Sequence, residues 1–127
     1  MKRSLFLTIV AILGFIFGAL LFLFPDKAGE GFGVALTPVS SLLFRTLGGM
    51  ILGSALLNFM VRKHSDSPTL KAVLATNLIM HALVMAVDIG GVSSGVLQFS
   101  KIAVGQLNHL FVGIGSLIYL VRMKQTA

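Results

Sequence analysis

The sequence predicts an all-α membrane protein with four transmembrane helices in an up-down-up-down bundle, forming a single domain over residues 1–127. Two observations predict this fold class. Hydrophobic residues make up 56% of the chain and charged residues only 11%, whereas a soluble domain carries about 25% charged residues. The chain also contains four apolar runs long enough to cross the hydrocarbon core of a bilayer, which is about 30 Å thick. Apolar side chains in this proportion need lipid around them.

The first apolar run covers residues 4–24 and follows Lys2 and Arg3. A cleaved signal peptide begins in the same way, but its apolar stretch is only about 7–15 residues long and ends at a site of small residues. The sequence Phe22-Leu23-Phe24-Pro25 offers no such site. We therefore expect a retained transmembrane helix.

The other three runs follow residues that favour a helix start. A Ser or Thr side chain can accept a hydrogen bond from the first free backbone N–H groups, and proline at the first helical position has no N–H to leave unpaired. The predicted spans and their starts are residues 38–61 with Thr37 as N-cap and Pro38 first, residues 69–89 opened by Ser67 and Pro68, and residues 102–121 preceded by Ser100. We expect the glycine-rich segments 26–37 and 90–101 to be turns on the membrane surface.

The basic residues predict the orientation, because cytoplasmic loops carry an excess of Lys and Arg. Three basic residues, Lys27, Arg45 and Lys101, belong to the opposite side. We expect a protein of the bacterial cytoplasmic (inner) membrane with both termini in the cytoplasm, whose +6 charge contacts membrane lipids and not nucleic acid. The seven residues on the predicted cytoplasmic side are Lys2, Arg3, Arg62, Lys63, Lys71, Arg122 and Lys124.

Several kinds of chemistry are missing from the sequence. The absence of Cys excludes thiol redox chemistry of the kind used by small membrane disulfide oxidases. The first span has no carboxylate, which a four-helix multidrug exporter would need there, and no Ser-His-Asp spacing is recognisable. We find no catalytic motif and expect an accessory or ligand-binding protein more than an enzyme.

Two glycine pairs have the i, i+4 spacing that lets membrane helices approach closely. They are Gly14 with Gly18 and Gly49 with Gly53. Such surfaces serve either packing within one chain, which we favour, or a homo-oligomer.

Ionisable side chains inside the spans are the most informative feature, because each costs several kcal/mol in hydrocarbon unless it finds a partner. Arg45, His81 and His109 lie about 10–12 Å from the outer ends of their spans, and Asp88 lies near the surface. Helical spacing places Asn77, His81 and Asp88 on one face, and Gln106 with His109 on another. The candidate ligand-binding residues are Arg45, Asn77, His81, Gln106 and His109, with Asp88 at the mouth of a pocket open to the outer leaflet.

Several interpretations of these residues stay open. In a purely structural one, Arg45 pairs with Asp88 and the two His residues hydrogen-bond between helices. In the ligand interpretation, a quinone, lipid or other amphipathic molecule places its polar head at Arg45 and the His residues. A b-type haem with His81 and His109 as axial ligands is an alternative, as is an ion or proton path. The mixed set of His81, His109 and Asp88 is no recognised metal signature, so no metal site is predicted.

The middle of the chain resembles the small DoxX-like four-helix membrane proteins of bacteria. The resemblance rests on Phe44-Arg45-Thr46-Leu47-Gly48-Gly49, the basic turn Arg62-Lys63, and a third span with Asn77 and His81. Some members of that family are associated with quinone-linked oxidoreductases. The resemblance therefore implies a quinone as ligand, but it supplies no catalytic residue.

Overall fold

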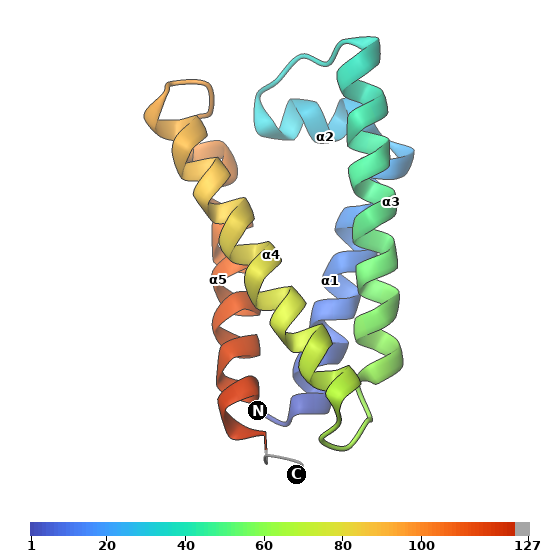
Figure 1. Ribbon diagram of the computed structural model, residues 1–127. Helices are drawn as coiled ribbons and strands as arrows, with labels where there is room; N and C mark the ends of the chain where they lie inside the picture. The colour runs from blue at the N-terminus through green and yellow to red at the C-terminus, as the bar shows by residue number, and fades with distance from the viewer. Residues whose placement is uncertain (124–127) are drawn as a thin grey trace. The chain divides into compact units, whose positions relative to one another are not determined.

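The computed structural model describes residues 1–123, and its regular structure is α-helical throughout that range, which confirms the all-α prediction (Figure 1). The predicted cytoplasmic residue Lys124 lies outside the described residues. The helices are α1 (Arg3–Leu23), α2 (Pro25–Phe32), α3 (Pro38–Val61), α4 (Pro68–Ser93) and α5 (Phe99–Arg122).

Four of these helices, α1, α3, α4 and α5, are long and apolar enough to cross a membrane. The shortest has 21 residues, which corresponds to about 31 Å at about 1.5 Å per residue. Many of their large apolar side chains are exposed, including Val104 at 81% and Val121 at 77%. Exposed apolar surface of this extent is characteristic of helices that face lipid. The chain is thus a small multi-span membrane protein.

The predicted starts of α3 and α4 are confirmed. Thr37 and Ser40 form a reciprocal capping box at α3, and the Ser67 side chain accepts a hydrogen bond from the backbone N–H of Leu70 at α4. The predicted cap at Ser100 is wrong, because α5 begins at Phe99 and its N-cap position is Gln98, whose side chain makes no cap hydrogen bond.

The first glycine-rich segment was expected to be a turn, but it contains the helix α2. Pro25 occupies the first position of α2, and Gly33 ends it in a left-handed conformation with φ 74°. Phe32 stacks edge-on against both Phe17 of α1 and Phe44 of α3, with ring centroids 6.2 Å apart in each case. These contacts hold α2 across the ends of the two longer helices (Figure 1).

The predicted end of the third span at residue 89 falls short of the end of α4, which continues to Ser93. Gly90 and Gly91 lie inside the helix, and Gly95, with φ 74°, provides the left-handed residue that ends it. The backbone N–H groups of Gly95 and Val96 bond back to the carbonyls of Val92 and Gly91, which is a Schellman motif.

The chain divides into two compact units, Met1–Arg62 and Lys63–Ala127. In the first, α1 and α3 are antiparallel and in close contact. A Cβ placed on Gly48 would lie 2.6 Å from the Phe22 backbone nitrogen and 2.7 Å from the Gly18 carbonyl oxygen. Gly53, in contrast, has no atom within 4 Å of such a Cβ. The predicted packing glycines Gly14 and Gly18 thus face α3, while the closest approach on α3 itself is at Gly48.

In the second unit, α4 and α5 pack side by side, as the yellow and orange-red ribbons of Figure 1 show. Side-chain contacts between His81 and His109 and between Asp88 and Gln106 show that the two helices are antiparallel. This helix pair carries five of the six predicted site residues.

Candidate functional site

Arg45, in the first unit, lies on α3 and donates a hydrogen bond from Nη1 to the carbonyl oxygen of Phe22, at 2.7 Å. Phe22 belongs to the last turn of α1, where backbone carbonyls have no partner within the helix. The negative end of the α1 dipole also lies there, so the cationic guanidinium is stabilised at this position. The structure therefore gives Arg45 a local partner inside its own unit.

Asp88 has a partner of its own in the second unit. The Nε2 amide of Gln106 on α5 donates a hydrogen bond to Asp88 Oδ2 on α4. Gln106 is buried, with 8% of its surface exposed, and Asp88 is half-buried. This hydrogen bond joins two of the predicted site residues across the α4–α5 contact. The expected pairing of Asp88 with Arg45 stays a prediction.

His81 of α4 and His109 of α5 are in direct contact. Their Nδ1 atoms are 2.7 Å apart, and the ring centroids are 4.9 Å apart with an angle of 52° between the planes. One Nδ1 must donate and the other accept, so two neutral rings in this contact are opposite tautomers. The two imidazoles therefore hydrogen-bond between helices, as the structural interpretation expects, and each Nε2 is left for another partner.

The contact between the His residues does not fit axial ligation of a haem. Two nitrogens on opposite sides of one metal ion are separated by about 4 Å, because each metal–nitrogen bond is about 2.0 Å long. The Nδ1 atoms are much closer, at 2.7 Å. A haem would also need a flat macrocycle between the rings. The side chains would have to separate considerably before this ligation became possible.

Asn77 lies on α4 about one turn from His81, towards the start of the helix, and is buried with 2% of its surface exposed. The two hydrogen-bonded pairs form a polar layer in the second unit, made up of His81, Asp88, Gln106 and His109. Asn77 lies about 16 Å from Asp88 along α4 and is outside this layer. Two hydrogen bonds thus join side chains of two different spans, while a ligand pocket formed by the candidate residues stays a prediction.

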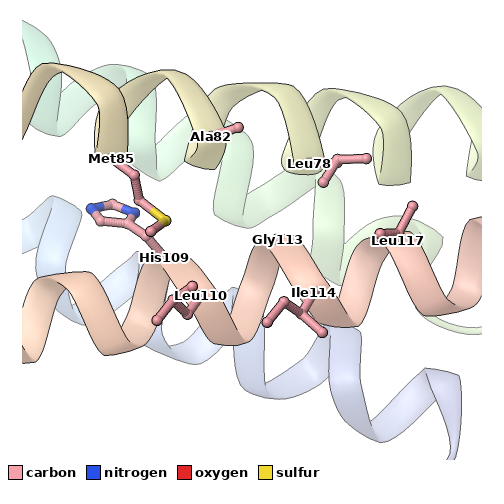
Figure 2. Close-up of a pocket in the computed structure, with 8 residues that line it drawn as sticks. All are labelled: Leu78, Ala82, Met85, His109, Leu110, Gly113, Ile114 and Leu117. Carbon is pink, nitrogen blue, oxygen red and sulfur yellow. The ribbon is translucent and has the colours of Figure 1, made fainter. Parts of the chain in front are cut away.

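Next to the polar layer, α4 and α5 form an apolar groove of about 150 Å³ that sequence reasoning did not predict. His109 is its one polar side chain and lies at one end, beside Met85 (Figure 2). The feature of the sequence that could have indicated the groove is the small size of Ala82 and Gly113, which leaves space between their larger neighbours. The groove is lined by Leu78, Ala82, Met85, His109, Leu110, Gly113, Ile114 and Leu117.

The described residues contain no cluster of three or more His, Cys, Asp or Glu side chains arranged to hold a metal ion. Two pairs of donor and acceptor side chains are in contact between α4 and α5: the two imidazoles, and Asp88 with Gln106.

Comparison with known proteins identifies a family but no activity. The profile of a family described as a domain of unknown function (DUF8292) matches residues 8–127. The chain therefore belongs to this family. No curated protein and no solved structure matched the chain. The resemblance to DoxX-like proteins finds no support in these comparisons, and the quinone that it implies rests on the geometry of the groove alone.

Proposed function

We propose that this member of the DUF8292 family is an accessory protein of the bacterial cytoplasmic membrane that binds a quinone, a lipid or another amphipathic molecule. The single observation that supports the proposal is the groove between α4 and α5, which has seven apolar lining residues and His109 at one end. A ligand with an apolar tail and a hydrogen-bonding head matches this distribution of side chains.

The head group has to supply most of the affinity. A ligand tail that moves from the bilayer into the groove exchanges one apolar environment for another, because lipid chains are as apolar as leucine side chains. A hydrogen bond to an imidazole, in contrast, has no equivalent in the hydrocarbon. We therefore expect His109, with His81 behind it, to select the ligand by its head group.

The proposed membrane arrangement follows the basic residues. An up-down-up-down bundle with both termini in the cytoplasm puts the starts of α1 and α4 on the cytoplasmic side. The Asp88–Gln106 pair then lies in the outer half of the bilayer, and the two His residues lie near its middle. A periplasm-only reporter fused within residues 90–98 should be active, and the same reporter fused after Arg122 should be inactive. The reverse pattern would refute this orientation.

The ligand is tested by purifying the protein in a mild detergent and analysing extracted lipids and quinones by mass spectrometry. Ala82→Phe fills the groove from its exposed side, and Ala86→Phe adds the same ring one turn further along α4, at a residue that does not line the groove. We expect a specific molecule to co-purify with the native protein and with Ala86→Phe but to be lost from Ala82→Phe. Equal content in all three proteins would contradict the proposal.

The contact between the two His side chains disfavours the haem alternative, because their Nδ1 atoms are too close for axial ligation. An absorption spectrum of the same preparation separates the two functions. We expect a colourless protein. A strong haem band that is lost in both His81→Ala and His109→Ala, but kept in His64→Ala, would establish the haem protein in place of the proposed function.

A further inference from the structure

We propose that His81, Met85 and His109 form a binding site for a soft monovalent metal ion, Cu⁺, between α4 and α5. This inference goes beyond the proposed function, and the metal site does not require a ligand in the groove. It starts from two imidazole nitrogens already 2.7 Å apart on neighbouring helices.

Met85 provides the third donor atom. On α4 it follows His81 by one helical turn, so both side chains lie on nearly the same face. Across the helix pair, Asp88 meets Gln106, and a Cβ on Gly113 would lie 3.9 Å from the His81 Cβ. In both pairs the two residue numbers add up to 194. A constant sum of this kind marks residues that lie opposite one another in two antiparallel helices. Met85 and His109 share that sum and line the same groove, where Figure 2 shows the thioether beside the imidazole.

The distance between the imidazoles is suited to a metal ion on one side of the pair. With metal–nitrogen bonds of about 2.0 Å and a bent angle at the metal, the two nitrogens would be about 3.3 to 3.5 Å apart. Starting from 2.7 Å, this requires the two nitrogens to separate by about 0.6 to 0.8 Å, which small side-chain rotations supply. The same rings are much too close for the opposite-side ligation that a haem needs.

The donor types favour Cu⁺ among the common metal ions. Thioether sulfur is a soft ligand that selects Cu⁺, and imidazole binds copper as well as zinc. The nearest carboxylate, Asp88, already accepts the hydrogen bond from Gln106. The remaining side chains around Met85 in the groove are apolar. Hard ions such as Mg²⁺ and Ca²⁺ need several oxygen ligands, which these residues do not offer.

The charge of Asp88 also favours a monovalent ion. A cation inside the hydrocarbon region is strongly destabilised unless an opposite charge lies nearby. Asp88 follows Met85 by about one turn of α4, about 5 Å along the axis. Neutral imidazoles and a thioether leave the charge of Cu⁺ balanced by this one carboxylate, whereas Zn²⁺ would leave one positive charge uncompensated.

The experiment measures Cu⁺ binding to the full chain in detergent, under anaerobic conditions with ascorbate and a chromophoric Cu⁺ chelator as competitor. Two matched controls remove the same residue types elsewhere: His64→Ala in the turn before α4 and Met80→Leu on α4 itself. We expect one Cu⁺ per native or control chain, a loss of about 100-fold in affinity in His81→Ala and His109→Ala, and about tenfold in Met85→Leu.

A second measurement does not depend on the folding of any variant. X-ray absorption of the Cu⁺-loaded native protein should show two nitrogen neighbours and one sulfur neighbour. Three results would each overturn the inference: no stoichiometric Cu⁺ at micromolar chelator competition, full binding in both His variants, or a copper environment without sulfur. None of these affects the groove ligand, which is tested with Ala82→Phe, so either proposal can fail while the other stands.

Discussion

The close approach of α1 and α3 gives the most direct test of the described packing, through alanine substitution of glycine. At Gly48, the added Cβ would meet three backbone atoms: the nitrogen and Cα of Phe22 and the carbonyl oxygen of Gly18, at 2.6, 3.0 and 2.7 Å. Ordinary carbon–oxygen contacts begin at about 3.3 Å. Because backbone atoms cannot rotate away, the helices have to separate by about 0.6 Å.

That separation weakens the packing along the whole α1–α3 contact. Overpacking of this kind typically costs about 1–3 kcal/mol of stability. The matched control is Gly53→Ala, where nothing lies within 4 Å of the added Cβ. This change should be stabilising by up to about 1 kcal/mol, because alanine is the better helix former. Gly18→Ala should fall between them, since its nearest contacts, with Leu52 Cγ at 3.0 Å and with the Gly48 carbonyl oxygen and the Leu52 nitrogen at 3.1 Å, are longer than those at Gly48.

The assay heats each purified variant in detergent and measures the monodisperse fraction that remains by size-exclusion chromatography. We expect midpoint temperatures in the order Gly48→Ala, Gly18→Ala, native protein and Gly53→Ala, from lowest to highest. A Gly48→Ala midpoint equal to or above that of Gly53→Ala would refute the backbone contact. All three variants change one glycine to alanine, so differences between their midpoints do not come from amino-acid composition or from the detergent.

Three further predictions use the same assay. Arg45→Met should lower the midpoint temperature, because the Phe22 carbonyl loses its hydrogen-bond donor. If Arg45 and Asp88 have separate partners, the losses of Arg45→Met and Asp88→Asn should add in the double variant. Strong coupling between the two changes would instead establish that the residues pair directly. Gln106→Leu should destabilise the protein by about 1–3 kcal/mol, because the Asp88 carboxylate loses its hydrogen-bond donor. Adding Asp88→Leu to this variant should recover stability. A further loss of stability in the double variant would argue against the Asp88–Gln106 pair. Gly95→Ala should destabilise by about 1–2 kcal/mol because of its positive φ, whereas an unchanged midpoint would contradict the left-handed helix end.

The four membrane-spanning helices could be predicted from the sequence, because the hydropathy and length of a segment depend only on its own residues. Thr37 and Ser67 were predicted as caps because each precedes a proline that can only begin a helix. The prediction of Ser100 as a cap was wrong, because no proline follows Ser100 to fix the helix start there. Helix α5 begins one residue earlier, at Phe99. Gly90 suggested a helix end, but a glycine in a helix interior is only mildly unfavourable, and the end depends on the left-handed Gly95.

The features that sequence reasoning missed depend on contacts between helices. The pair Gly49 and Gly53 has the spacing of a packing motif, but the rotation of α3 turns Gly48 towards α1. Helix α2 is held by Phe32 between two other aromatic rings, which no local pattern reveals. The groove likewise exists only because Ala82 and Gly113 face the same space.

The two proposals meet at His109, and its two ring nitrogens decide how they interact. A metal ion bound at Nδ1 forces the remaining proton onto Nε2, so that Nε2 becomes a hydrogen-bond donor. A groove ligand whose head presents a carbonyl oxygen would then bind more tightly, and one whose head only donates would bind less tightly. Because coupling between two sites is reciprocal, the carbonyl ligand should raise the affinity for Cu⁺ by the same factor. Measuring Cu⁺ affinity with and without a ubiquinone analogue tests this: an increase is expected, and a decrease would mean that ligand and metal compete for the same nitrogen.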